Sequence, residues 1–202
     1  MIQTQIRSQI EASISVKQAL LADSALLGEL QQLAERCLAS LKAGGKIIFA
    51  GNGGSFADAQ HLSAEFTSRF LFDRAPLASI VLAANNSGIS AIGNDYGYEF
   101  VFARELEALA RPEDVFIAIS TSGNSTNILE AVKVAKARGI NTVAFTGASG
   151  GKLREMCECI RIPSSETARI QECHILIGHV VCALVESAYF QPPETGRKKD
   201  EA

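Results

Sequence analysis

The segment KIIFAGNGGSFADA, residues 46–59, decides the expected fold. Its first part, Lys46–Ala50, is short and apolar enough to be a buried strand. The glycines that follow permit a tight turn, and Ser55 then stands at the start of a helical stretch near residues 55–70. A strand, a glycine-rich turn and a helix in this order are typical of an α/β fold with a parallel sheet.

The same alternation continues along the chain. Further β-rich runs are Ser79–Leu82, Asp114–Ile119, Asn141–Phe145 and Glu158–Ile162, with helical stretches near 98–110, 125–138, 149–156 and 167–190. Buried strands that alternate with helices predict a parallel five-stranded sheet with helices on both faces. We therefore expect one domain over residues 1–191, and we expect the polar residues 192–202 to be a disordered tail.

The N-terminal region has a different pattern. From residue 3 to about residue 42, apolar residues recur at three- and four-residue spacing, which indicates helix. Asp23 and Ser24 offer a break or N-cap, so we expect a helical hairpin over residues 1–43. Its apolar stripe can be buried against a second subunit, and the alternative is that the pair covers one face of the sheet.

Composition narrows the class of protein. Of 202 residues, 47% are apolar and 20% charged, which excludes a disordered chain. A net charge of −3 gives no basic field, so we expect no nucleic-acid partner. The apolar runs are shorter than the ~20 residues of a membrane span, and the N-terminus lacks the apolar core of a signal peptide. Five cysteines without zinc-finger spacing fit reduced thiols, so we expect a cytoplasmic protein with no membrane partner.

Two loops at strand ends have the composition of anion sites. Gly53, Gly54 and Ser55 follow the first strand, and a run of hydroxyl residues from Ser120 to Ser125 follows the third. Backbone N–H groups at a helix N-terminus together with hydroxyls can hold a phosphate. Neither loop has the spacing of a Walker A or Rossmann fingerprint, and turn formation with helix capping is the alternative. Because neither loop contains lysine or arginine, a phosphorylated sugar suits them better than a triphosphate.

All three histidines lie on two predicted helices. His61 and Glu65 are four residues apart, so they share one helix face, with the spacing of metal ligands or of an acid–base pair. A purely structural pair has the same spacing. His179 lies in the apolar run Ile175–Val181, where a pocket-facing position would give it an adjustable pKa. Cys157 and Cys159 are interpreted as buried thiols.

Several separate segments, in order, resemble one known family. GNGGSFADAQHLSAEF, AIGNDYGYE, ISTSGNS and RIQECHILIGH are similar to the signature segments of the phosphoheptose isomerases, which belong to the sugar-isomerase (SIS) domain superfamily. The resemblance extends from the N-terminal helices to about Phe190. It implies a flavodoxin-like sheet, a homotetramer with active sites between subunits, and one Zn²⁺ per subunit. The implied reaction converts D-sedoheptulose 7-phosphate to D-glycero-D-manno-heptose 7-phosphate through an enediol, toward nucleotide-activated heptose for lipopolysaccharide or capsule.

The resemblance also implies roles for individual residues. Glu65 matches the general base and His179 its acid partner, and the zinc ligands match His61, Glu65, Gln171 and His179. The positions that match substrate or phosphate contacts are Asn52, Gly53, Gly54, Ser55, Asn94, Asp95, Ser120, Thr121, Ser122, Ser125 and Gln171.

The chain departs from the family pattern in one segment. Where the family commonly has Thr-Asp-Thr-Ser, this chain has Ala84, Asn85, Asn86 and Ser87, so an amide replaces a carboxylate. This keeps an isomerase of another phosphosugar as an alternative. A second alternative is a non-catalytic SIS protein of the type that binds the replication initiator, but such proteins lack the glutamate and the last histidine that are present here. A SIS sensor would need a DNA-binding domain, for which the chain has no room.

Overall fold

A computed structural model describes residues 1–190, so the expected tail over 192–202 lies outside the described residues. The helices are α1 (Ile2–Ala22), α2 (Ser24–Lys42), α3 (Gly54–Thr67), α4 (Asn86–Asp95), α5 (Val101–Leu109), α6 (Thr126–Ala137) and α7 (Thr167–Phe190). The strands are β1 (Ile47–Gly51), β2 (Ser79–Val81), β3 (Val115–Ile119), β4 (Asn141–Thr146) and β5 (Glu158–Arg161). Two short 3₁₀ turns cover Tyr98–Phe100 and Gly151–Glu155.

The strands confirm the predicted parallel α/β sheet. Within residues 1–190 they form one five-stranded sheet in the order β2-β1-β3-β4-β5, and every neighbouring pair is parallel. This is the strand order of flavodoxin-like folds, in which the chain winds one way from β1 to β2 and the other way from β3 onward. The crevice between the carboxyl ends of β1 and β3 is therefore the point where such folds bind ligands.

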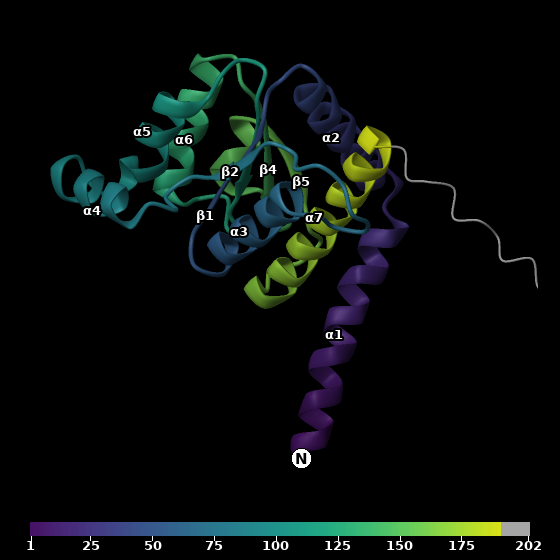
Figure 1. Ribbon diagram of the computed structural model, residues 1–202. Coiled ribbons are helices and arrows are strands. Elements are labelled where there is room, and N and C mark those ends of the chain that lie inside the picture. The colour runs from purple at the N-terminus through teal and green to yellow at the C-terminus, as the bar shows by residue number, and fades with distance from the viewer. Residues whose placement is uncertain (191–202) are drawn as a thin grey trace, which may run out of the picture.

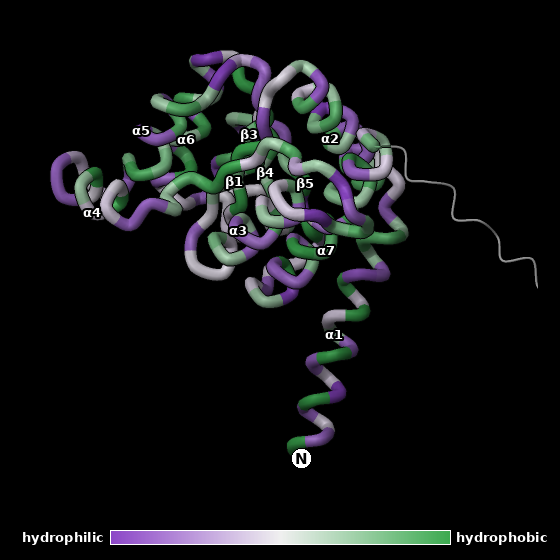
Figure 2. The backbone as a smooth tube through the Cα atoms, viewed as in Figure 1, coloured by the Kyte–Doolittle hydropathy of each residue, from purple (hydrophilic) through white to green (hydrophobic). Residues whose placement is uncertain are grey.

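Alternating side chains of each strand supply two apolar layers. Ile47 and Phe49 of β1 pack with residues of α2, α3 and α7, whereas Ile48 and Ala50 pack with residues of α5 and α6. Figure 1 shows the corresponding arrangement, with α4, α5 and α6 on one side of the sheet and α2, α3 and α7 on the other. In Figure 2 the central strands are mostly hydrophobic, as expected for a sheet that is covered on both faces.

The N-terminal helices break where predicted, but they do not form a hairpin that packs along its length. The Asp23 carboxylate caps α2 by accepting hydrogen bonds from the N–H groups of Ala25 and Leu26, at 3.0 and 3.1 Å. Helix α2 covers the sheet beside α7, whereas α1 extends away from the domain and buries only Leu20 (Figure 1). The alternative in which the pair covers one face of the sheet therefore holds for α2, whereas α1 contacts α7 from Gln9 onward and projects beyond the domain with its first turns.

Three helical segments differ from the prediction. Helix α4 was not expected, because its sequence NSGISAIGND holds two glycines and none of its residues is buried in the described chain. The stretch predicted over 98–110 is a 3₁₀ turn followed by α5, and the stretch over 149–156 is a single 3₁₀ turn. The first of these stretches thus keeps its predicted length, whereas Gly150 and Gly151 at the start of the second disfavour an α-helix there.

Helix α7 spans the residues predicted for it, but it is more apolar over its length than the short apolar runs of the sequence indicated. By length and composition it is long and apolar enough to cross a membrane. In this fold it is the core helix, because Ile177, Val181 and Val185 are buried against α2, α3 and the sheet.

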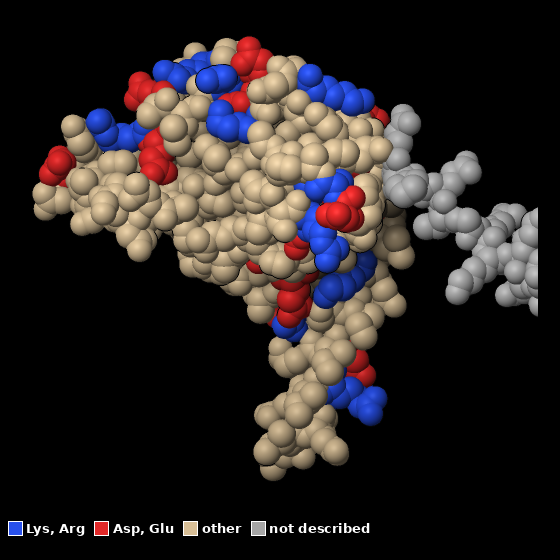
Figure 3. All heavy atoms as spheres, in the orientation of Figure 1, with Lys and Arg blue, Asp and Glu red and all other residues tan. Residues whose placement is uncertain are grey.

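The outer surface is mixed in charge, and Figure 3 shows basic side chains close to acidic ones on the face in view.

Candidate active site

The two predicted anion loops lie side by side at the switch point. They follow β1 and β3, which are hydrogen-bonded neighbours, and each leads into a helix. The first loop needs its glycines, because Gly53 has φ +55° and a β-carbon on Gly51 would lie 2.4 Å from the carbonyl oxygen of Ser55. Ser55 and Ser120 are almost fully buried at the two turns, and the hydroxyls of Ser120 and Ser125 are 3.1 Å apart.

Paired amides join the two loops. Asn52 and Asn127 exchange two side-chain hydrogen bonds of 2.9 Å each, and the Tyr98 hydroxyl donates to Asn52 at 3.3 Å. The three residues line an open hollow of about 470 Å³ together with Glu99 and Thr126. The sequence analysis identified Asn52 but assigned no role to Tyr98, which lies in the AIGNDYGYE segment, or to Asn127, which follows the second loop. The hollow has the polar lining that a sugar would need.

The other predicted substrate contacts lie in two places, the second anion loop and the end of α4. Thr121 lies in the second loop, where its carbonyl accepts from the N–H of Gly147 at 2.9 Å. The Ser122 hydroxyl accepts from the N–H of Asn124 at 3.2 Å, so it stabilises the turn itself. Asn94 and Asp95 are exposed at the end of α4, at the edge of the molecule in Figure 1, and their side chains bond to each other at 2.7 Å. Within the described residues, no hydrogen bond joins these two side chains to the two anion loops or to His61, Glu65 and His179.

Asn85 lies in the segment 84–87, which differs from the family pattern, and its side chain caps a helix. Its side-chain oxygen accepts from the N–H of Gly88 at 3.1 Å at the start of α4. Aspartate and asparagine are both good N-caps, so either side chain satisfies the same helix end.

His61, Glu65 and His179 form a three-residue cluster between α3 and α7. The Nε2 atoms of His61 and His179 are 2.9 Å apart, and Nε2 of His61 is 3.2 Å from Oε1 of Glu65. One ligand atom from each residue lies within 4.8 Å of the others. The four-residue spacing of His61 and Glu65 therefore predicted their shared face correctly, and the structure adds His179 to it.

A missing side chain lets the two helices approach. A β-carbon on Gly178 would lie 2.4, 2.6 and 3.0 Å from three side-chain atoms of Leu62, which is itself fully buried. Gly178 and Leu62 are direct neighbours in sequence of His179 and His61. Close packing at this point is what brings the two imidazoles into contact.

His179 is held as a neutral imidazole. Burial lowers its pKa, the nearby His61 lowers it further, and the Glu65 carboxylate opposes both. The ring of Phe70 stacks on it, with centroids 5.4 Å apart and planes 18° from parallel. A neutral imidazole keeps one lone pair and one N–H, which suits both metal binding and proton transfer.

Gln171 lies at the opposite end of this helix pair. A β-carbon on Gly54 would lie 2.5 Å from its Nε2 atom, so the amide lies against the first loop. Eight residues of helix separate Gln171 from His179, about 12 Å along the axis. Within one chain the structure thus joins three of the four predicted zinc ligands and leaves Gln171 beside the loop, where it fits the predicted substrate contact.

The chain resembles known proteins over almost its whole length. The profile of the SIS domain family matches residues 12–147. The phosphoheptose isomerase of Aneurinibacillus thermoaerophilus is 54% identical over 92% of this chain and 94% of that protein. Phosphoheptose isomerase 2 of Campylobacter jejuni is 50% identical over 92% of each chain. The solved phosphoheptose isomerase of Neisseria gonorrhoeae superposes with a TM-score of 0.86 at 41% identity, covering 93% of this chain and 100% of that one.

Proposed function

The chain belongs to the SIS domain family and, within it, to the phosphoheptose isomerases, and we propose that it converts D-sedoheptulose 7-phosphate to D-glycero-D-manno-heptose 7-phosphate. The observation that carries this proposal is the His61–Glu65–His179 cluster between α3, which leaves the first anion loop, and α7, whose Gln171 lies against that loop. The loops at the crevice would hold the phosphate, and the cluster has the groups that proton transfer needs.

The reaction moves protons without net oxidation. In our proposal Glu65 removes the proton from C1 of the ketose, and His179 gives a proton to the oxygen on C2, which yields the enediol. Glu65 then returns its proton to C2 while His179 takes the hydroxyl proton from the oxygen on C1, which yields the aldose. The lowered pKa of His179 supports this role, because a neutral imidazole can donate from one nitrogen and accept at the other.

We propose one Zn²⁺ per subunit at the cluster. Two imidazoles and a carboxylate within 4.8 Å of one another are the donor set of a catalytic zinc site with an open position. When bound, the ion would polarise the substrate carbonyl. Because Glu65 cannot be a tight ligand and a free base in one geometry, its two proposed roles require a rearrangement during turnover. As fourth ligand, Gln171 would have to come from a second subunit, because within one chain it lies about 12 Å along α7 from His179.

A homotetramer is part of the same proposal. Ile2, Ile6, Ile10 and Ile14 recur every fourth residue on α1 and are between 48% and 75% exposed. This is one continuous apolar stripe on a helix that extends from the domain, and helices of other subunits would cover it.

We further propose a cytoplasmic enzyme at the start of nucleotide-activated heptose synthesis for lipopolysaccharide or capsule; its free thiols suit a reducing compartment.

Turnover of sedoheptulose 7-phosphate by the purified protein, before and after chelation and zinc addition, tests the proposal. We expect activity that chelation removes and zinc restores. Glu65→Gln should lower kcat about 100- to 10,000-fold, the usual contribution of a general base. The matched variant Glu107→Gln, on exposed α5 surface, should retain activity. No turnover by zinc-replete protein would favour another phosphosugar or a non-catalytic binding role, and an active Glu65→Gln would remove Glu65 as the base.

A further inference from the structure

The segment between α3 and β2 is bound to the end of α3 by one arginine. The Arg74 guanidinium donates to the carbonyl oxygens of Glu65 at 2.6 Å, Phe66 at 2.7 Å and Ser68 at 2.9 Å. The last carbonyls of a helix have no partner within the helix, and a cation is favourable there. Arg74 therefore fixes the backbone of Glu65, whose side chain belongs to the cluster.

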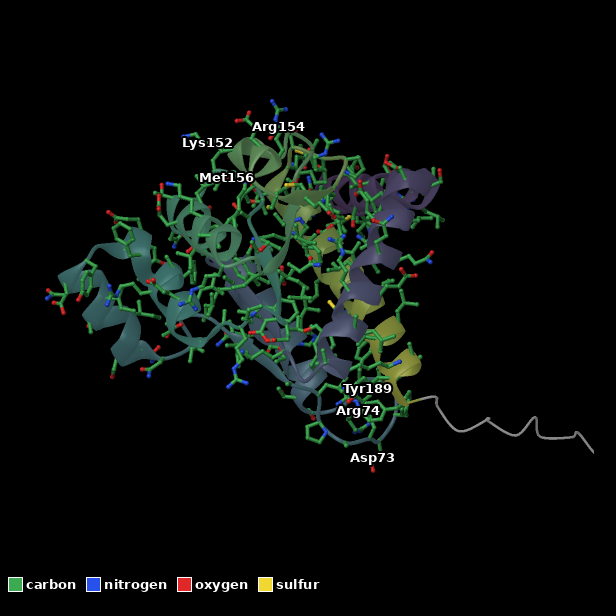
Figure 4. The ribbon with its side chains drawn as sticks, turned by 90° about the horizontal axis from the view of Figure 1, so that it is seen from above. Asp73, Arg74, Lys152, Arg154, Met156 and Tyr189 are labelled. Atoms are coloured by element: carbon green, nitrogen blue, oxygen red, sulfur yellow. The ribbon has the colours of Figure 1, made fainter. Side chains whose placement is uncertain are left out.

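Glu186 of α7 binds the same segment from the other side. One carboxylate oxygen accepts from Nε of Arg74 at 2.8 Å and from the N–H of Phe70 at 2.9 Å, and the other accepts from the N–H of Leu71 at 2.7 Å. The side chains of Arg74 and Glu186 are 3% and 1% exposed. We call these two side chains, with the N–H groups of Phe70 and Leu71, the Arg74–Glu186 clamp. Figure 4 labels Arg74 near the end of α7, where its guanidinium lies 5.5 Å from the ring centroid of Phe190.

A buried ion pair of this kind is costly unless its hydrogen bonds are satisfied. Here both carboxylate oxygens of Glu186 accept hydrogen bonds, and all three nitrogens of the Arg74 guanidinium donate. A hydrophobic pair could join α3 to α7 without that cost, but it would not fix the backbone of residues 70 and 71. The result of the clamp is therefore a defined position for the Phe70 ring.

That ring covers His179. Glu186 follows His179 by seven residues, two helical turns, so both face the same side of α7. With its N–H held by Glu186, Phe70 stacks on the imidazole of His179, at 5.4 Å between centroids. The clamp thus acts at two points of the cluster: on the backbone of Glu65 through Arg74, and on the ring of His179 through Phe70.

We propose that Phe70 is a positioning residue that fixes the ring plane of His179 for proton transfer, and that the Arg74–Glu186 clamp holds Phe70 there. This rests on the proposed isomerase function for its kinetic consequence only. The stacking itself has a signature that is independent of activity, because protons of His179 that face the Phe70 ring are shielded and resonate upfield.

The experiment combines steady-state kinetics with proton NMR of the zinc-free protein. The chain has three histidines, so the His179 ring signals can be assigned by their loss in His179→Gln. Phe70→Leu should move these signals downfield and lower kcat about tenfold, with KM unchanged, because a displaced catalytic group slows the reaction more than it weakens binding. Phe70→Tyr, which keeps the ring, should restore both readouts. Glu186→Gln should act like Phe70→Leu, because an amide cannot accept all three hydrogen bonds.

Leu71→Ala is the matched control, since this neighbour shares the clamp through its backbone while its side chain is 61% exposed. It should change neither readout. The Phe70 variants keep the test decisive even if Glu186→Gln does not fold. Unmoved His179 signals in Phe70→Leu would overturn the proposal, as would a lowered kcat that Phe70→Tyr does not restore. An inactive wild type with shifted His179 signals in Phe70→Leu would instead count against the isomerase function alone.

Discussion

His174 and His179 are five residues apart on the same helix and have opposite environments. His174 is fully buried, its Nε2 lies 3.2 Å from the carbonyl oxygen of Thr146, and its ring tilts against Phe145. His179 is partly exposed and meets His61 at 2.9 Å. One face of α7 therefore packs against the sheet, and another contacts His61 of α3.

The difference shows that environment, not residue type, decides what a histidine does. Burial lowers the pKa of both imidazoles, for His174 to about 4, so both stay neutral near pH 7. At His174 this neutrality permits packing. At His179 it leaves a lone pair and an N–H available to a ligand.

The largest expected effect separates the two histidines by activity. His179→Gln should lower kcat about 100- to 10,000-fold, the contribution of a general acid–base group, while the protein stays folded. His174→Gln should keep its activity once folded, because an amide can still donate to the carbonyl of Thr146. Isomerase kinetics beside circular dichroism measure both variants, and equal losses of kcat would contradict the division.

The second-largest expected effect is on stability in acid, and it concerns His174. Because the pKa of His174 falls from 6.5 to about 4 on folding, the unfolded chain binds more protons between these values. The contribution of the neutral His174 to the free energy of unfolding is present above pH 6.5 and is lost as the pH falls toward 4. The total loss over this range is about 3 kcal/mol. Urea unfolding of the wild type and His174→Gln at pH 7 and pH 4.5 should show a smaller loss in the variant. Parallel pH profiles would refute the assignment.

The smallest expected effect is that of a substitution at Asn85, which lies near neither His174 nor His179. Asn85→Asp restores the carboxylate that the family commonly has, yet the side chain caps α4 through the N–H of Gly88. The free energy of unfolding should change by no more than about 0.5 kcal/mol. Turnover of sedoheptulose 7-phosphate should stay unchanged. A marked shift in kcat/KM would mean that this position contacts the substrate despite its capping bond.

Most of the fold was predictable because each strand is a short apolar run followed by a turn signal. β1 and its glycine loop gave the clearest case, and the predicted helix break at Asp23 is confirmed by the cap. Helix α4 was not predictable, since it buries no residue and so carries no apolar period. The projection of α1 depends on which surfaces meet, which local spacing does not encode.

Spacing alone predicted the site only where its residues lie close in sequence, and the family resemblance was needed to group His179 with His61 and Glu65. His61 and Glu65 are one helical turn apart, so spacing alone placed them on one face. The pairing of Arg74 with Glu186 spans 112 residues and leaves no local pattern. Gln171 matches a family motif, yet within this chain it lies against Gly54 rather than at the cluster. Motif membership therefore pointed to Gln171 as a candidate site residue without giving its distance from the others.

Gly178 also limits which mutations the gene can tolerate. Every amino acid that a single-base change can introduce at a glycine codon carries a β-carbon, and at this position that carbon would collide with Leu62. A one-step substitution would therefore have to displace the buried Leu62 side chain, which is the neighbour of His61. Position 178 thus constrains the cluster through packing, although glycine has no side chain that could take part in the chemistry.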